Sequence, residues 1–240
     1  MIFSNLLFIF IFLPIFLCIY YIVPMKFKNF ILLVFSLIFY GFGEPIYILL
    51  LLFVSIMNYI FGIFIDKSKK KTKKKLLLIG AVILNLLILM YFKYTNFIID
   101  NMNLIGLNIS PRNIKLPLGI SFFIFQTLSY VIDLYYGRIK REKNFINFMT
   151  YVSMFPQLIA GPIVRYEDIS NQMQEREISF KKFSNGVFIF LTGLFKKVLI
   201  ANNVGYLYSL ISKDIASASL MTAWLGAIAF TIQLYFDFSG

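Results

Sequence analysis

Apolar runs long enough to cross a lipid bilayer recur along this chain and constrain its fold more than any other feature. An α-helix needs about 20 apolar residues to span the hydrocarbon core of a membrane. The candidate spans are residues 2–23, 30–42, 46–65, 76–95, 117–136, 145–164, 184–204 and 218–238. With 60% hydrophobic residues over 240 positions, we predict an all-α, multi-span membrane protein and interpret residues 1–240 as one transmembrane domain.

The first apolar run is interpreted as a retained span. Residues 1–24, MIFSNLLFIFIFLPIFLCIYYIVP, lack a basic n-region and a small-residue cleavage site. The run is also too long for a signal peptide.

The positive charge is concentrated at the ends of the spans. The net charge is +12, and much of it lies in KSKKKTKKK (67–75) and RIKREK (138–143). Such clusters usually face the cytoplasm and its anionic lipids, which predicts an external GFGEP turn (41–45) and an amino terminus outside. Because residues 30–42 are short for a crossing, we expect little tilt, local bilayer thinning or snorkelling of Lys28. The basic runs are too short and too closely tied to span ends to favour nucleic-acid binding.

Residue types that many enzymes depend on are missing. The chain has no histidine and one cysteine, Cys18, which excludes an intramolecular disulfide, a thiolate cluster and histidine-based sites within these residues. The sequence also contains no GxSxG, P-loop or dinucleotide-binding fingerprint and no metal-ligand spacing.

The stretch FPQLIAGPIVRY (155–166) breaks an otherwise apolar segment. Pro156, Gly161 and Pro162 are poorly compatible with a continuous buried helix. One interpretation is a re-entrant pair of half-helices, which keeps both flanks cytoplasmic; the other is a proline-kinked single crossing. Irregular backbone at membrane depth is tolerated only where protein or water satisfies its polar groups, so the first interpretation predicts that the segment lines a cavity.

The segment 117–136 carries a start signal and two polar residues. We expect Pro117 of LPLG (116–119) in the first helical turn, where a missing N–H costs nothing. The polar residues are Gln126 and Asp133. Asp133 is expected at the membrane interface, near Arg138, rather than buried.

Other polar or charged groups stand in apolar surroundings and are functional hypotheses by default: Gln157, Arg165, Lys196, Lys197 and Asp237. The two lysines either face an aqueous cavity or mark a cytoplasmic interface. Asp237, followed by Ser239 and Gly240, either interrupts a helix, caps the start of a helix or lies at the end of a span.

Four motifs carry a family resemblance: LPLGISFFIFQTLSYVIDLYYG (116–137), MTYVSMFPQLIAGPIVRYEDI (149–169), GLFKKVLIANN (193–203) and IQLYFDFSG (232–240). In this order they resemble the successive motifs of the membrane-bound O-acyltransferase family, and in particular its bacterial alginate O-acetyltransferase branch.

The resemblance implies a wall of helices around a funnel in a bacterial cytoplasmic membrane. An acyl group from acetyl-CoA or another acyl thioester would pass to an exported polysaccharide such as alginate, with an extracytoplasmic polysaccharide-modifying partner. The candidate funnel or donor-side residues are Gln157, Gly161, Pro162, Arg165, Lys196, Lys197, Asp237 and Ser239. No cofactor or metal is expected to be bound.

The resemblance also predicts what these residues lack. Family members continue well beyond YFDFSG, and the histidine taken as catalytic lies in that later part. We therefore interpret the chain as the amino-terminal half of an acyltransferase, assign no catalytic residue within it and expect it to be inactive alone.

Two other functions are considered. A transporter also uses half-helices broken in the membrane, but it should show an internal inverted repeat, and nothing in residues 1–110 mirrors FPQLIAGPIVRY. A non-catalytic membrane scaffold is the remaining alternative.

Overall fold

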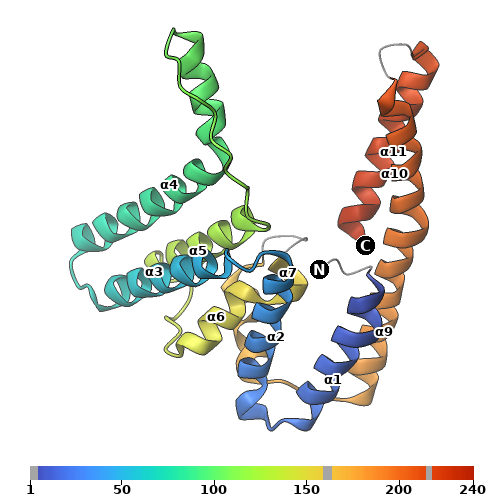
Figure 1. Ribbon diagram of the computed structural model, residues 1–240. Helices are drawn as coiled ribbons and strands as arrows, with labels where there is room; N and C mark the ends of the chain where they lie inside the picture. Colours follow the sequence, from blue (N-terminus) through green and yellow to red (C-terminus); the bar gives the residue numbers. More distant parts are fainter. Residues whose placement is uncertain (1–4, 159–163, 215–217) are drawn as a thin grey trace. The chain divides into compact units, whose positions relative to one another are not determined.

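The computed structural model describes residues 5–158, 164–214 and 218–240, and these ranges form helices joined by turns and loops without any strand (Figure 1). The helices are α1 (Leu13–Ile22), α2 (Lys28–Gly43), α3 (Ile48–Lys67), α4 (Lys71–Leu104), α5 (Ile120–Tyr135), α6 (Phe145–Ser153), α7 (Phe155–Leu158), α8 (Tyr166–Gln174), α9 (Phe180–Phe195), α10 (Asn202–Lys213) and α11 (Leu220–Ser239). Three short elements complete them: the π-helical turns η1 (Phe8–Phe12) and η3 (Lys196–Ala201), and the 3-10 turn η2 (Met25–Phe27). The predicted all-α fold class is confirmed.

The chain folds into two compact units. The first unit comprises Pro14–Glu175, and the second comprises Ile2–Leu13 together with Arg176–Gly240. Each is described by itself below.

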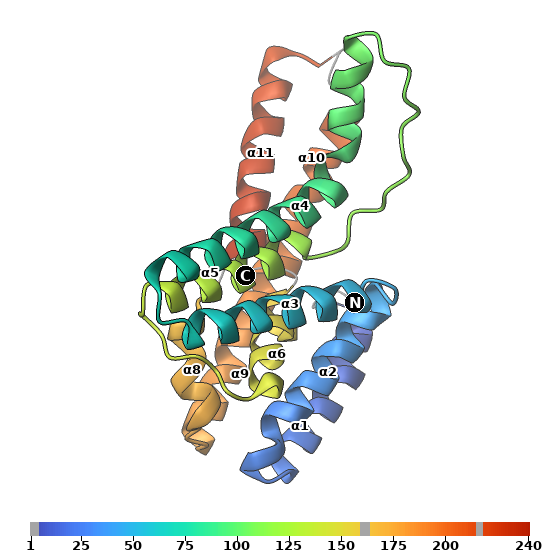
Figure 2. The same ribbon diagram turned by 90° about the vertical axis from the view of Figure 1, so that its left-hand side faces the viewer.

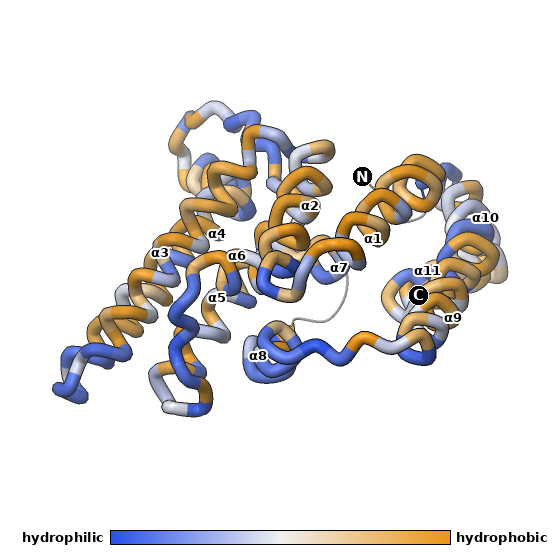
Figure 3. The backbone as a smooth tube through the Cα atoms, turned by 90° about the horizontal axis from the view of Figure 1, so that it is seen from below, coloured by the Kyte–Doolittle hydropathy of each residue, from blue (hydrophilic) through white to orange (hydrophobic). Residues whose placement is uncertain are grey.

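Within the described ranges, five helices are long and apolar enough to cross a membrane: Met25–Gly43, Ile48–Lys67, Lys71–Leu104, Phe180–Lys213 and Leu220–Ser239. They correspond to the predicted spans 30–42, 46–65, 76–95, 184–204 and 218–238. Figure 3 shows hydrophobic residues along α2 and α3, whereas hydrophilic residues gather at the α3–α4 connection and on α8. The chain is thus an integral membrane protein, as its apolar runs predict.

Two predicted spans are shorter than expected. The helical parts of 2–23 and 117–136 are Phe8–Ile22 and Ile120–Tyr135, which fall below the length of a full crossing. The placement of Pro117 in the first turn of α5 was wrong. Its carbonyl accepts a hydrogen bond from Ile120 N at 3.3 Å, and the chain enters the helix through Gly119, whose φ of +74° suits only glycine without strain.

Lys28 does not snorkel toward an interface. Only 2% of the residue is exposed, because α1 covers it: the Nζ atom donates to the Tyr20 carbonyl at 2.7 Å and lies 4.4 Å from the centre of the Tyr20 ring. The 3-10 turn before α2 also lengthens this span to 19 residues, Met25–Gly43. Snorkelling was expected because residues 30–42 alone are short for a crossing, and the longer helix does not need it.

In the first unit, α5 forms the centre of the core. Ten of its 16 residues are buried, and α3, α4 and α6 pack against it; Figure 2 shows α3, α4 and α5 running side by side. A polar link crosses these three helices at full burial. Asn58 Nδ2 donates to Asn85 Oδ1 at 3.0 Å and to Thr127 Oγ1 at 3.2 Å, so the amides satisfy one another where water is excluded.

The second unit is built on a helical hairpin. A continuous helix runs from Phe180 to Lys213 through the π-helical turn η3, and α11 packs antiparallel against it. On the first helix, Gly193, Lys197 and Gly205 lie against α11 and Gly240. Ala201, on the same spacing of four residues, is buried. The predicted interruption at Asp237 was wrong, since α11 continues to Ser239; the alternative, a residue near the end of a span, agrees with the structure.

Candidate functional site

The break predicted in the segment 145–164 begins just before Pro156. α6 ends at Ser153, Met154 leaves the helical conformation, and the short helix α7 starts at Phe155. Pro156 lies in the first turn of α7, where its missing N–H costs no hydrogen bond. Gly161 and Pro162 lie outside the described residues.

Two glutamine side chains satisfy the carbonyl that this break releases. In a continuous helix, Tyr151 O would accept from Phe155 N, but Phe155 N donates instead to Ser36 Oγ of α2 at 3.1 Å. Tyr151 O accepts from Gln126 Nε2 at 2.8 Å and from Gln157 Nε2 at 2.6 Å. These contacts give Phe155 N and Tyr151 O new partners where the helix breaks, which makes the break tolerable inside an apolar bundle.

The first two family motifs meet at this break. An added Cβ on Gly119 would lie 2.6 Å from the Leu158 carbonyl oxygen, which shows how closely the start of α5 approaches the end of α7. The Tyr151 hydroxyl extends the contact, because its single proton has two carbonyl acceptors within reach, Val164 O at 3.0 Å and Gln126 O at 3.2 Å. LPLG (116–119) and FPQL (155–158) are therefore in direct contact at the break.

Asp133 is buried, contrary to its predicted interfacial position. The residue is 1% exposed and its Oδ1 lies 3.2 Å from Arg138 Nη1 and 3.7 Å from Arg165 Nη2. The sequence indicated Arg138 as a neighbour, but Arg165 approaches only because α8 folds back against the end of α5. A buried carboxylate is tolerated when cations lie beside it. For Asp133 these cations are Arg138 and Arg165.

A second buried acid, Glu142, links the loop after α5 to α8. Its carboxylate accepts from Tyr166 Oη at 2.5 Å and from Asn144 N at 2.8 Å, while Glu142 N donates to Tyr130 Oη at 3.0 Å. Burial raises the pKa of the Tyr166 hydroxyl, and the neighbouring Glu142 raises it further. Tyr166 therefore remains a neutral hydrogen-bond donor under physiological conditions.

The other two family motifs meet in the second unit. Lys197 of η3 forms an ion pair with Asp237 of α11, and Lys196 Nζ donates to the Ser239 carbonyl at 3.2 Å. Beside them, Gln233 Oε1 is buried and has no hydrogen-bond partner within the described ranges. The π-helical turn that carries both lysines is a rare element that occurs often at functional sites.

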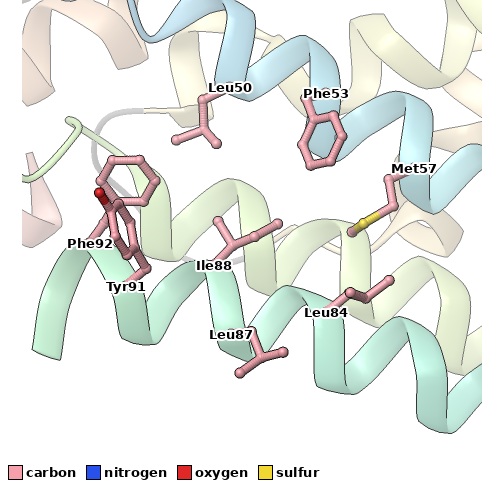
Figure 4. A pocket seen from close by; sticks show the side chains of 8 residues that line it. All are labelled: Leu50, Phe53, Met57, Leu84, Leu87, Ile88, Tyr91 and Phe92. Atoms are coloured by element: carbon pink, nitrogen blue, oxygen red, sulfur yellow. The ribbon is translucent and has the colours of Figure 1, made fainter. Parts of the chain in front are cut away.

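An apolar groove of about 430 Å³ lies between α3 and α4. Figure 4 shows its lining side chains, which come from the two helices: Leu50, Phe53 and Met57 from α3, and Leu84, Leu87, Ile88, Tyr91 and Phe92 from α4. The lining is apolar apart from the Tyr91 hydroxyl, which is the one ionisable group among these side chains.

Each unit brings together its own set of polar groups. The first unit holds glutamine amides, a tyrosine hydroxyl and two guanidinium groups, and the second holds two ammonium groups and a carboxylate. No cluster of three metal-ligating acids, histidines or cysteines occurs among the described residues.

Several of the polar residues described above were not predicted from the sequence. Asn58 and Asn85 are single amides within apolar runs, SIMNYIF and VILNLLI, and that isolation is a signal that could have identified them. Tyr151, Glu142 and Gln233 carry no comparable signal, because their roles depend on contacts with distant parts of the chain.

Comparisons with known proteins place the motifs in one family. The model described as "MBOAT, membrane-bound O-acyltransferase family" matches residues 35–240. A probable alginate O-acetylase AlgI of Pseudomonas syringae pv. tomato is 40% identical over 247 residues, covering all of this chain and 47% of that protein. The protein of the same name in Azotobacter vinelandii is 38% identical over 251 residues, covering all of this chain and 49% of that protein.

A peptidoglycan O-acetyltransferase of Helicobacter pylori is 34% identical over 273 residues, covering all of this chain and 52% of that protein. The chain thus spans about half the length of the curated relatives it matches.

Proposed function

The chain belongs to the membrane-bound O-acyltransferase family, and we propose that it acts in O-acyl transfer, passing an acetyl group to a hydroxyl of an exported cell-surface polysaccharide. The observation that carries this proposal is the alignment of the entire chain with relatives named for O-acetylation of alginate and of peptidoglycan. In each unit, two of the family motifs lie in contact, which supports a functional role for these contacts.

The proposed acyl donor is a thioester such as acetyl-CoA. Arg165, Lys196 and Lys197 are the proposed donor-side residues, because cations near the mouth of a cavity raise the local concentration of a polyanionic donor. The half-exposed guanidinium of Arg165 supports this role. Gln157, Asp237 and Ser239 are the proposed funnel residues, together with Gly161 and Pro162.

We further propose that α6 and α7 form a re-entrant segment whose two flanks face the cytoplasm. α6 has nine residues, a length of about 14 Å, whereas the hydrocarbon core is about 30 Å thick. With the lysine-rich α3–α4 connection also cytoplasmic, the amino terminus lies outside, in a bacterial cytoplasmic membrane. A partner that modifies the polysaccharide outside the membrane completes the proposed system.

Transfer to a hydroxyl requires a base that accepts its proton. The 240 residues contain no histidine, so a histidine base must come from outside them. We assign binding and positioning to the residues described here and no proton transfer.

Deletion of the gene in its native host tests the proposal. We expect the exported polysaccharide to lose its O-acetyl groups, measured by alkaline release of acetate, while the amount of polysaccharide stays unchanged. Complementation should restore the acetyl groups. Loss of the exported polysaccharide itself, with normal acetylation of the remainder, would point to a transporter instead.

A further inference from the structure

Two arginines share one buried carboxylate at the end of α5. The side chains of Arg138 and Arg165 are 51% and 50% exposed, whereas that of Asp133 is 1% exposed. Both guanidinium groups approach the same oxygen, Oδ1, and only Arg138 is within hydrogen-bonding distance of it. The other oxygen, Oδ2, is buried and accepts no hydrogen bond from the described residues. One buried carboxylate thus lies beside two arginine side chains that are each about half exposed at the protein surface.

Each arginine is held by a further contact. The Arg138 guanidinium lies 5.4 Å from the centre of the Tyr136 ring, a cation–π arrangement that limits its movement. Arg165 is the residue before α8, and its backbone N–H donates to Asp168 Oδ2 at 3.3 Å. The Arg138 guanidinium and the Arg165 backbone are therefore positioned by these contacts, and Asp133 Oδ1 lies near both guanidinium groups.

We propose that Arg138 and Arg165 form a binding site for a phosphate group and that Asp133 is the positioning residue that holds them. A guanidinium presents five donors in a planar fork that matches phosphate oxygens, and it is weakly hydrated. Two cations on one anion leave a net positive charge, and Lys140 and Lys143 follow in the loop after Arg138. The inference does not depend on the proposed acyl transfer.

The phosphate can come from two sources that share this chemistry. One is the headgroup of an anionic lipid, since the site lies at the end of an apolar helix of a membrane protein. The other is a soluble phosphate ester, such as the nucleotide part of a donor. Recognition by the guanidinium groups is the same in both cases, and the experiment has one arm for each source.

The first arm measures binding of pyrophosphate to the full chain in phosphatidylcholine nanodiscs by calorimetry. We expect Arg138→Gln and Arg165→Gln each to weaken binding by about tenfold, because each removes charge-assisted hydrogen bonds. The matched control is Arg112→Gln, which removes the same charge from an exposed loop and should change binding less than about twofold.

The second arm measures the retention of phosphatidylglycerol by native mass spectrometry, with phosphatidylcholine as the neutral reference. If the lipid is the source, wild type and Arg112→Gln retain phosphatidylglycerol, and both site variants lose it. If the site variants lose only phosphatidylglycerol retention, the site binds lipid. If they lose only pyrophosphate binding, the site binds a soluble phosphate ester.

The variant Asp133→Asn tests whether Asp133 positions the two arginines or only reduces the positive charge around them. If the arginines act only as charges, removing the carboxylate strengthens anion binding; if Asp133 positions them, binding weakens. Should a glutamine variant fail to fold, judged by gel filtration, Arg138→Lys and Arg165→Lys keep the charge but lose the fork and should still bind several-fold more weakly. The proposal is overturned if neither arm separates the site variants from Arg112→Gln, or if acetate competes as well as pyrophosphate.

Discussion

The two units of this protein bury their polar groups in different ways. In the first unit, α5 is surrounded by other helices, and 33% of the most apolar window of Ile48–Lys67 is buried inside the protein; for Phe180–Lys213 in the second unit the share is 6%. Contacts within the first unit supply partners for the broken helix, for the amide cluster and for the buried acids Asp133 and Glu142, although Asp133 Oδ2 accepts no hydrogen bond from the described residues. The second unit is a hairpin whose ion pair lies on its seam.

The difference shows where irregular structure can exist in a membrane protein. A chain break requires neighbours that donate to the freed carbonyl, and the first unit provides them in Gln126 and Gln157. The hairpin has no such surroundings, and it keeps regular helices with one π-helical turn. Lipid or other protein must cover its many exposed apolar side chains.

The largest predicted effect is at the contact between α5 and α7. Gly119→Ala should lower the free energy of unfolding by about 3 kcal/mol, because the residue has a positive φ and the new Cβ would clash with the Leu158 carbonyl oxygen. Gly137→Ala is the matched control: its φ is also +74°, but nothing lies within 4 Å of the new Cβ, so it should cost only about 1 kcal/mol. Unfolding in detergent–SDS mixtures measures both, and equal losses would show that the contact contributes nothing.

The amide cluster is the next test of the first unit. Asn58→Leu should destabilise by about 1–2 kcal/mol, since it leaves the buried Asn85 amide without a partner. Asn58→Leu with Asn85→Leu should cost less than the sum of the two single changes. Strict additivity in the same unfolding assay would mean that the two amides do not support each other.

A smaller effect is expected at α8, which lies outside the membrane-spanning helices. Tyr166→Phe removes one hydrogen bond to Glu142 and should cost about 1 kcal/mol. Because the folded pKa of Tyr166 is raised, this contribution is fully present below the unfolded pKa of about 10 and is lost as the pH rises through the higher folded value. The stability difference from wild type should therefore be constant from pH 7 to pH 9, and a decline within that window would contradict the assignment.

The smallest effect is predicted for the hairpin. A Cβ on Gly205 would meet the end of the Gln233 side chain at 2.7 Å, which can move, and alanine favours helix by about 1 kcal/mol over glycine. Gly205→Ala should therefore be nearly neutral, whereas Gly186→Ala, with open space around it, should stabilise. A loss at Gly205 as large as at Gly119 would show that the second unit is packed as tightly as the first.

The sequence predicted the regular parts of the fold well. Long apolar runs without charges become helices because a backbone in lipid must satisfy its own hydrogen bonds, and Pro156 correctly marked a break in one of them. The family resemblance, carried by four motifs, agrees with the match over residues 35–240.

The partners of the polar residues could not be predicted in the same way. Asp133 was expected at an interface because its sequence neighbours are aromatic and basic, but its burial depends on Arg165, which is 32 positions away. Gly119 replaced Pro117 as the start signal of α5 for a similar reason, since the nearby Leu158 carbonyl is visible only in three dimensions. Long-range contacts, rather than local propensity, determine the candidate site.

The central claim is that α6 and α7 enter and leave the membrane on one side, and cysteine labelling tests it most directly. With Cys18→Ser as background, Lys140→Cys before α6 and Ser170→Cys in α8 would be exposed to an impermeant maleimide in intact spheroplasts and in inverted vesicles. Arg112→Cys, in the loop after α4, serves as the control for the opposite side. The account predicts that positions 140 and 170 are labelled only from the cytoplasmic side and position 112 only from outside; labelling of 140 and 170 from opposite sides would contradict it.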